Sequence, residues 1–443
     1  MNVQGYIQKI EERNFTVGIL GLGYVGLPLM WTFHEQGLPV LGFDVDEAKV
    51  KNLTSGTPYI KHLGKEMMQS LAQSDICDAT TDFSRLKEAD AVLLCVPTPL
   101  NQYREPDMSY VISTTETVAH HLREGQLVIL ESTTYPGTTE EVMIPLLEKH
   151  SGLIAGKDFY VAYSPEREDP GNPNFNTAKI PKVVGGHGED ALKLAQALYD
   201  TAIVQTVPVS DTKTAEAVKI TENVFRSVNI ALVNELKVVY AKMGIDVHEV
   251  LDAADTKPFG FMKFTPGPGL GGHCIPIDPF YLTWKAREFK ENTRFIELAG
   301  EINTHMPEYV VEQTSIALNT HKKAVNGSKI LLVGLAYKPN VDDMRESPTF
   351  ELMHLLEELG AEVAFYDSYI PTIPPTREHA EYTGKYSVEW DQATIGDFDA
   401  VLIATNHSDI NYQELADWSD CVIDTRNAMK GIPPRQEHHI FKA

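Results

Sequence analysis

A glycine-rich turn near the N-terminus restricts the possible folds of this chain of 443 residues more than any other feature. The segment Val17-Gly-Ile-Leu-Gly21-Leu-Gly23-Tyr24-Val25-Gly26 follows an apolar run and precedes a helical segment that begins near Leu27. Glycines at this spacing permit a tight turn, a close approach of a pyrophosphate to the backbone, and close packing of helix on strand. The segment therefore predicts a strand, a turn and a helix whose N-terminus binds a dinucleotide.

An acidic residue at the end of the next strand indicates which dinucleotide is bound. Asp44 ends the apolar run Val40–Asp44, where its carboxylate can accept hydrogen bonds from the adenosine ribose and would repel a 2′-phosphate. NAD is therefore the predicted cofactor rather than NADP. Asp46 is the competing candidate, although it lies beyond the strand end.

Short β-branched runs alternate with amphipathic segments along most of the chain, which is typical of βαβ units in a parallel sheet covered on both faces. The α/β fold expected is two Rossmann-like, doubly wound parallel-sheet domains joined by a long central helix, Asp211–Met243. The expected domains are 1–210, which binds NAD, 211–325, a central helical and dimerisation region, and 326–443, a second Rossmann-like domain. The residues from Gly431 onward are expected to form a tail. The expected strands are Thr16–Leu20, Val40–Asp44, Ala91–Val96, Leu127–Glu131, Tyr160–Tyr163, Lys329–Val333, Glu362–Tyr366, Ala400–Ile403 and Cys421–Asp424, with a helix over Phe350–Leu359.

Composition excludes several classes of function. The formal net charge of −24 disfavours binding to nucleic acid or to an anionic membrane. Neither a secretory signal nor a long uncharged apolar stretch is present in the sequence, so a cytoplasmic protein is expected. The four cysteines form no CxxC pair, which predicts neither a disulfide framework nor a metal site.

Two loops that follow predicted strands are candidates for the nicotinamide end of the cofactor site. One is Val96–Leu100, with Pro97 and Thr98, and the other is Glu131–Gly137, with Ser132 and Thr133. Ligands of such folds bind outside the carboxyl ends of the strands. Ordinary turns rich in Pro and Thr are the alternative interpretation.

One cysteine differs from the others in its surroundings. Cys274 lies in the loop Pro266–Pro279, whose glycines and prolines specify an unusual backbone path. Cys95 and Cys421 lie in apolar strands, where a buried thiol is inert. Cys274 is therefore the candidate nucleophile. Its neighbour His273 is not assigned as a base, because adjacent side chains usually point apart.

The long helix carries a second candidate pair. Lys219 and Asn223 are four residues apart and share one face. An amine and an amide on a largely buried helix can hold an oxyanion formed at a carbonyl carbon. A solvated lysine is the alternative.

In its motifs the chain resembles the nucleotide-sugar 6-dehydrogenases, which comprise UDP-glucose, UDP-N-acetylhexosamine and GDP-mannose dehydrogenases. The resemblance rests on six motifs in order and covers the chain from about Val17 to beyond Asp367. They are Gly21–Gly26, Ser132-Thr133, Ser164-Pro-Glu166-Arg167, Ala217–Asn223, Gly271-Gly-His-Cys274, and Gly334–Pro339 together with Arg345-Glu-Ser-Pro348.

The resemblance implies a homodimer or a dimer-based oligomer, with NAD on the first domain and UDP on the second. It implies that Cys274 is the nucleophile, that Lys219 and Asn223 stabilise an oxyanion, and that Asp278 activates water or holds Lys219. Thr133 and Glu166 would position the hydrolytic water. By the same motifs the substrate residues are Glu166, Arg167, Lys219, Asn223, Gly271 and Lys338, and Arg345 would contact the cofactor or the diphosphate.

The implied reaction is a four-electron oxidation of the C6 alcohol of a UDP-sugar to a carboxylate, through a thiohemiacetal and a thioester on Cys274. The loop Gly271–Tyr281 resembles that of UDP-N-acetylhexosamine enzymes. With Lys257–Phe261 it is more similar to enzymes of UDP-N-acetylglucosamine than of UDP-N-acetylmannosamine, which implies a role in surface polysaccharide precursor synthesis. UDP-N-acetylmannosamine, UDP-N-acetylgalactosamine and UDP-glucose remain alternatives. A 3-hydroxyacid dehydrogenase would leave Cys274 and the second α/β half unexplained, and a noncatalytic NAD-binding protein would produce no NADH.

Overall fold

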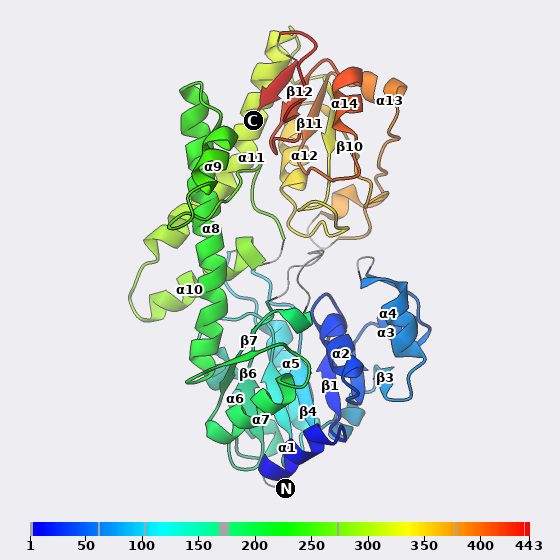
Figure 1. The fold of residues 1–443 in the computed structure, drawn as a ribbon, viewed down its shortest axis with the longest axis vertical. Coiled ribbons are helices and arrows are strands. Elements are labelled where there is room, and N and C mark those ends of the chain that lie inside the picture. The colour runs from blue at the N-terminus through cyan, green and yellow to red at the C-terminus, as the bar shows by residue number, and fades with distance from the viewer. Residues whose placement is uncertain are drawn as a thin grey trace. The chain divides into compact units, whose positions relative to one another are not determined.

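The structure, a computed structural model, describes residues 3–60, 63–101, 103–167, 177–272, 274–376, 379–437 and 439–443, and only the backbone of Cys274. The chain divides into two compact units. Unit 1 comprises Met1–Asn223 and Phe280–Asn292, and unit 2 comprises Val224–Pro279 and Thr293–Ala443. Each unit is built around one β-sheet (Figure 1).

The sheet of unit 1 has the order β3-β2-β1-β4-β5-β6-β7-β8. The strands β3, β2, β1, β4, β5 and β6 are paired in parallel. Strand β7 is antiparallel to β6, and β8 is parallel to β7. Its strands are β1 Val17–Leu20, β2 Val40–Phe43, β3 Cys77–Thr80, β4 Ala91–Leu94, β5 Leu127–Leu130, β6 Tyr160–Tyr163, β7 Lys182–Gly186 and β8 Thr206–Val209. Its helices are α1 Val3–Glu11, α2 Gly26–Glu35, α3 Glu47–Thr54, α4 Lys65–Ala72, α5 Ser109–His121, α6 Ile144–Ser151 and α7 Glu189–Tyr199, with short helical segments Phe83–Glu88, Thr139–Met143 and Thr177–Lys179.

Both faces of the central part of this sheet are buried, because alternate residues of its inner strands join different hydrophobic clusters. Val17 and Ile19 of β1 pack with residues of α1, α2 and α7. Leu20 of the same strand packs in the cluster that contains residues of α5 and α6. This arrangement is the doubly wound fold, and it explains why the central strands are continuous apolar runs.

Two helices belong in part to each unit. Helix α8, Thr212–Lys242, is one uninterrupted helix of 31 residues that passes from unit 1 to unit 2 after Asn223. Asp211 caps it by accepting a hydrogen bond from the amide of Thr214 at 2.7 Å. Helix α10, Cys274–Glu288, begins in unit 2 and enters unit 1 at Phe280. The long central helix predicted from the sequence is therefore present, and each of its ends lies within one residue of the expected bound.

Unit 2 has a five-stranded parallel sheet of order β10-β9-β11-β12-β13. Its strands are β9 Lys329–Val333, β10 Glu362–Tyr366, β11 Ala400–Ile403, β12 Val422–Asp424 and β13 Ile440–Lys442. Its helices are α9 Val247–Asp255, α11 Arg294–Thr320, α12 Pro348–Glu358, α13 Gln392–Gly396 and α14 Tyr412–Trp418, with a short turn Ala380–Tyr382. Helices α11 and α12 cover one face and α13 and α14 the other. The predicted α/β class with two Rossmann-like parallel-sheet domains is confirmed.

The sequence analysis missed four strands, and one of them corrects the expected tail. Residues Ile440–Lys442 form β13, which pairs with β12, so the chain end is part of the sheet. Strands β3, β8 and β13 lie at sheet edges and have few buried residues. They therefore lack the continuous apolar run that identified the central strands. Strand β7 is wholly buried, but it begins with a lysine and ends in two glycines.

Among the described residues, no helix is long and apolar enough to cross a membrane.

Candidate active site

The three glycines of the β1–α2 turn meet different physical demands. Gly21 has a φ of +93°, and a Cβ there would lie 2.3 Å from the carbonyl oxygen of Cys95. A Cβ on Gly26 would lie 1.8 Å from the carbonyl oxygen of Gly21, whereas a Cβ on Gly23 would meet nothing within 4 Å. Turn and helix packing require Gly21 and Gly26, and the open side at Gly23 leaves room for a phosphate. The turn therefore fits a dinucleotide.

The structure distinguishes the two acidic residues that follow β2. Asp44 is buried and accepts hydrogen bonds from the amides of Leu22 at 2.8 Å and Asp46 at 2.9 Å, and its carboxylate is 3.1 Å from the ammonium of Lys49. Asp46 is instead the N-cap of α3 and accepts a hydrogen bond from the amide of Ala48. Asp44 is thus the carboxylate held beside the glycine turn.

The loops after β4 and β5 are tied together by Ser132. Its hydroxyl donates to the carbonyl oxygen of Val96 at 2.7 Å and accepts from the amide of Val96 at 2.9 Å. Thr98 is buried, Thr133 is half-buried and Pro97 is exposed. The structure therefore brings together the two loops that the sequence singled out, and Ser132 holds their spacing through backbone contacts.

A buried glutamate of α8 holds the rest of the second loop. The carboxylate of Glu216 accepts hydrogen bonds from the amides of Gly137 at 2.5 Å and Thr139 at 2.9 Å. Burial raises the pKa of Glu216 to about 7. The sequence analysis missed Glu216, although it lies one helical turn before Lys219.

Lys219 and Asn223 are both buried on α8, one turn apart. The ammonium of Lys219 lies 3.6 Å from the carboxylate of Glu166, which follows β6. The next residue, Arg167, forms an ion pair with Glu222 of α8 and donates to the carbonyl oxygen of Pro181 at 2.7 Å. Unit 1 therefore brings Glu166, Arg167 and Lys219 into one group of charged side chains, as expected if they serve one site.

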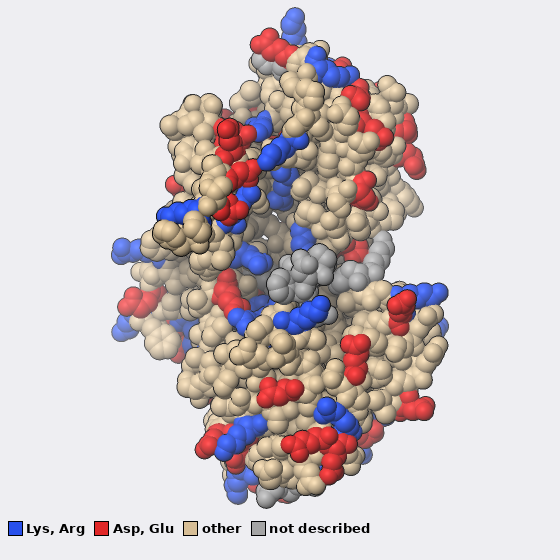
Figure 2. Space-filling model, viewed as in Figure 1, with Lys and Arg blue, Asp and Glu red and all other residues tan. Residues whose placement is uncertain are grey.

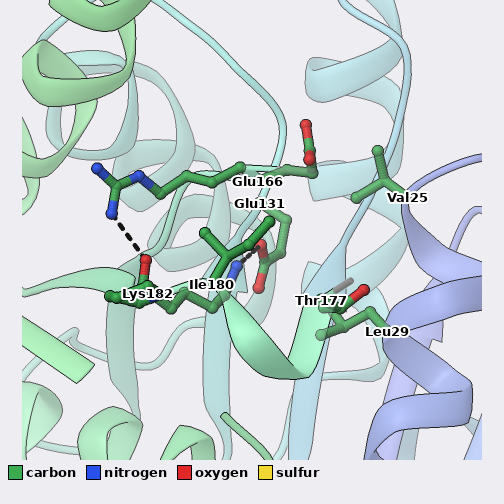
Figure 3. Close-up of a pocket in the computed structure, with 9 residues that line it drawn as sticks. Val25, Leu29, Glu131, Glu166, Thr177, Ile180 and Lys182 are labelled. Carbon is green, nitrogen blue, oxygen red and sulfur yellow. Dashed lines mark hydrogen bonds and ion pairs between the residues drawn. The ribbon is translucent and has the colours of Figure 1, made fainter. Parts of the chain in front are cut away.

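A second charged group, which the sequence analysis missed, lies behind Glu166. The ammonium of Lys182 is 2.6 Å from the carboxylate of Glu131, and the hydroxyl of Tyr199 donates to the other oxygen of that carboxylate. Figure 3 shows this pair in a pocket that Val25, just before α2, and Leu29 of α2 also line. A lysine at the start of a fully buried strand is the only sequence signal that could have indicated it.

In unit 2 the glycine loop contacts two other motifs. A Cβ on Gly271 would lie 2.7 Å from the Cβ of Tyr337, and the amide of Gly272 donates to the carbonyl oxygen of Arg345 at 3.1 Å. A Cβ on Gly269 would lie 3.0 Å from Pro348. The unusual backbone path is therefore required because the loop lies directly on the segments around Lys338 and Arg345.

Cys274 is the first residue of α10, and its side chain, like the whole of His273, lies outside the described residues. An N-terminal helix position favours a thiolate because the helix end carries partial positive charge. Asp278, one turn later, is fully buried. The second half of α10 is anchored in unit 1, where the Tyr281 hydroxyl donates to the Pro99 carbonyl at 3.3 Å and the Lys285 ammonium is 2.5 Å from Glu141.

The carboxyl ends of the strands in unit 2 carry further polar groups. Asp367, after β10, accepts hydrogen bonds from the amides of Leu335 and Ala336 at 2.7 and 2.9 Å, and His407 lies 3.0 Å from the same oxygen. These contacts shape the turn that leads to Lys338, which is half-buried. Arg345 is exposed and forms a 2.7 Å ion pair with Asp343.

Arg426, after β12, is a cation at this edge that the sequence analysis missed. Its Nε donates to the carbonyl oxygen of Ala404 at 2.7 Å, and a Cβ on Gly267 would lie 2.4 Å from its guanidinium. It is preceded by a short strand and has no motif around it, so only the fold identifies it.

On the face that Figure 2 shows, the acidic side chains are not gathered in one patch. Figure 2 shows acidic side chains over the visible face of each unit, interspersed with Lys and Arg. Local cationic groups such as Lys219 can therefore bind an anion despite the net charge of −24.

Three segments of the chain match three parts of one family. Residues 15–203 match the NAD binding domain of the UDP-glucose/GDP-mannose dehydrogenase family, residues 213–305 its central domain, and residues 331–431 its UDP binding domain. The matched segments include all the motifs described above.

Individual relatives cover almost the whole chain. UDP-N-acetyl-D-glucosamine 6-dehydrogenase of Pseudomonas aeruginosa is 34% identical over 90% of this chain and 92% of its own length. UDP-N-acetyl-D-mannosamine dehydrogenase of Pyrococcus horikoshii is 35% identical over 94% and 96%. The solved structure of UDP-D-ManNAc dehydrogenase from Pyrococcus horikoshii is similar with a TM-score of 0.86, at 34% identity, covering 97% of this chain and 99% of that one.

Proposed function

Because the chain belongs to the UDP-glucose/GDP-mannose dehydrogenase family and is an NAD-dependent UDP-sugar dehydrogenase, we propose that it oxidises UDP-N-acetylglucosamine at C6. The product would be UDP-N-acetylglucosaminuronate, a precursor for surface polysaccharide. The observation that carries the four-electron chemistry is the position of Cys274, at the start of α10 and at the end of a loop whose glycines contact the segments around Lys338 and Arg345.

The reaction consists of two oxidations and one hydrolysis. Bound NAD supplies the hydride acceptor for each oxidation, one molecule for each. The C6 alcohol first loses a proton and a hydride to become an aldehyde, and the thiolate of Cys274 adds to the aldehyde carbon. Loss of a second hydride from the thiohemiacetal leaves a thioester. Water then adds to the thioester carbon, the C–S bond breaks with its electron pair on sulfur, and the carboxylate is released.

The other residues have roles suited to their chemistry. Lys219 and Asn223 donate hydrogen bonds to the oxygen that becomes negative in the tetrahedral states. Glu166, whose carboxylate lies 3.6 Å from Lys219, positions the hydrolytic water together with Thr133. Asp278 either activates that water or holds Lys219. Lys338 and Gly271 contact the substrate, and Arg345 contacts the cofactor or the diphosphate.

The choice of sugar rests on the residues around Cys274. The segments Lys257–Phe261 and Pro276–Tyr281 resemble those of UDP-N-acetylglucosamine enzymes, and the Pseudomonas aeruginosa relative has that activity in its name. A pocket built to bond an acetamido group should bind a sugar with a hydroxyl in its place less well. UDP-N-acetylmannosamine is the second candidate, because the Pyrococcus horikoshii relative and its structure carry that name.

Steady-state NADH formation tests both candidates. UDP-N-acetylglucosamine should give the highest kcat/KM in a panel that also contains UDP-N-acetylmannosamine, UDP-N-acetylgalactosamine and UDP-glucose. A higher value for any of the other three would replace the proposed substrate while leaving the four-electron chemistry in place. No NADH from any nucleotide sugar would contradict the proposed activity itself.

A homodimer is proposed from an apolar stripe on α8. Phe225, Leu232 and Val239 follow one another at intervals of seven residues, and each is about half exposed. Met243, which directly follows the end of α8, is apolar as well and is 63% exposed. Apolar residues that repeat every seven positions on one helix face are the pattern by which helices associate. A second copy of this chain is the partner that the family resemblance implies for this surface.

A further inference from the structure

We propose that Lys182 is a positioning residue for thioester hydrolysis, because its ammonium holds together the two loops that carry Thr133 and Glu166. The inference rests on the proposed function, in which these two residues position the hydrolytic water. It assigns Lys182 no contact with substrate or cofactor.

Two contacts of Lys182 establish the connection. Its ammonium is 2.6 Å from Oε2 of Glu131 and donates to the carbonyl oxygen of Pro165 at 3.2 Å. Glu131 lies two residues before Thr133, and Pro165 lies immediately before Glu166. The side chains of Lys182 and Glu131 are only 7% and 0% exposed, so water cannot substitute for either contact.

The two loops leave neighbouring strands of the same sheet. Strands β5 and β6 are paired in parallel, with Leu130 opposite Tyr163, so both loops begin at the same edge. Strand pairing sets their separation up to this point, and beyond it the buried Lys182 ammonium bonds to both loops. Tyr199 of α7 fixes the carboxylate from its other side, since its hydroxyl donates to Oε1 of Glu131.

The network borders the pocket in which Glu166 lies. Figure 3 shows the Glu131–Lys182 pair on one side of this pocket, with the carboxylate of Glu166 directed away from the pair. The Glu166 carboxylate lies 3.6 Å from the ammonium of Lys219. Lys182 bonds to the backbone before Glu166, and the Glu166 carboxylate keeps its proposed role of positioning the hydrolytic water.

Energetics also favour a positioning role over a purely stabilising one. Burial raises the pKa of the Glu131 carboxyl, and the nearby Lys182 ammonium opposes that effect. A buried ion pair is often no more stabilising than a well-packed apolar pair of similar volume. What this pair provides and an apolar pair would not is a directed link between two loops.

The kinetic consequence should be specific to the last step. Both hydride transfers depend on the sugar, the cofactor and Cys274, whereas hydrolysis additionally requires a water held at the thioester carbon. A misplacement of about 1 Å can lower the rate of such a step about 100-fold. Loosening the two loops should therefore slow C–S cleavage by water and leave the formation of NADH on the first turnover nearly unchanged.

The experiment compares Lys182→Met with Lys182→Arg in the full-length enzyme. Rapid mixing with UDP-N-acetylglucosamine and NAD measures the first-turnover NADH, and intact-protein mass spectrometry measures the fraction of Cys274 that is acylated at steady state. We expect Lys182→Met to form two NADH per site at a nearly normal rate, to turn over about 100-fold more slowly, and to accumulate the acylated enzyme. Lys182→Arg, which keeps the charge, should recover much of the turnover.

Two further variants keep the test decisive. If Lys182→Met does not fold, the double variant Glu131→Gln with Lys182→Met removes the unpaired buried carboxylate, and the same acyl accumulation is expected. Lys193→Met breaks an exposed ion pair with Glu189 on α7 and should behave like the wild type.

Loss of first-turnover NADH in parallel with turnover would overturn the proposal, as would normal hydrolysis in either Met variant. Wild-type enzyme that forms no acylated Cys274 and only one NADH per sugar would instead contradict the proposed function.

Discussion

The carboxylate of Asp44 accepts a hydrogen bond from the backbone amide of Leu22 at 2.8 Å, so the end of β2 is tied directly to the glycine turn after β1. Unit 2 repeats this relationship: Asp367, at the end of β10, accepts from the amide of Leu335 at 2.7 Å in the turn after β9. In each unit an acidic residue of the second strand holds the turn that follows the first. Asp44 therefore shapes the turn in addition to the ribose-binding role proposed for it.

We predict that Asp44→Ala weakens NAD binding about tenfold or more and narrows the preference for NAD over NADP, because a charge-assisted hydrogen bond contributes about 1.5–3 kcal/mol. The ratio of kcat/KM for the two cofactors is the measurement. Asp46→Ala is the matched control: it removes the N-cap of α3 and should cost about 1 kcal/mol of stability without changing the ratio. An unchanged ratio in Asp44→Ala would move cofactor selection to another residue.

Cys274→Ser should abolish turnover, because a serine hydroxyl is not ionised near neutral pH and the thioester intermediate can no longer form. Wild-type enzyme should yield two NADH and one carboxylate per sugar. Cys421→Ser is the control, since that thiol is buried in unit 2 and burial raises its pKa to about 12. Near-normal turnover by Cys274→Ser would exclude this cysteine as the nucleophile.

Lys237, on α8 in unit 2, provides a prediction about pH. Its ammonium is buried with no hydrogen-bond partner among the described residues, and burial, with a smaller effect from Arg426, lowers its pKa to about 7. The folded pKa lies below the unfolded value of 10.5, so between these values the unfolded chain binds a proton that the folded chain lacks. The contribution of Lys237 to the free energy of unfolding therefore rises from pH 7 toward pH 10. Below pH 7 the buried side chain is charged, and the folded state bears the full cost of burying that charge.

Lys237→Met should accordingly increase the free energy of unfolding at pH 6 by several kcal/mol, since one pKa unit corresponds to about 1.4 kcal/mol. This increase in stability should become progressively smaller above pH 7. Urea unfolding at pH 6 and pH 9 measures both effects. Lys242→Met, on an exposed site of the same helix, should show no such difference. A Lys237→Met variant that is less stable at pH 6 would show that the ammonium has a stabilising partner.

Replacement of Leu232 and Val239 by glutamate should convert the proposed dimer into monomers, because the carboxylates would be buried in an apolar interface without partners. Light scattering during size-exclusion chromatography measures the mass. Ile154→Glu places the same charge on an exposed apolar site of unit 1 outside the stripe and should leave the mass unchanged. A dimer that survives both glutamates would place the interface elsewhere.

The sequence by itself determined most of the fold, because its signals are local. The strands β6, β9, β10 and β11 have the expected bounds, since each is a short apolar run between polar turns. The helix α8 followed from its apolar periodicity, and the glycine turn from three residues whose backbone demands are local.

The tertiary structure decided which residues meet. Lys182 carries no motif, and its pairing with Glu131 depends on β7 lying near β5 in the sheet, which separates the partners by 51 positions in sequence. The contact of Arg426 with Ala404 depends in the same way on which strands are adjacent in the sheet of unit 2. The pairing of β13 depends on β12 lying next to it at the end of that sheet. Such contacts arise from the pairing of distant segments, and because no local pattern records that pairing, only the folded chain reveals them.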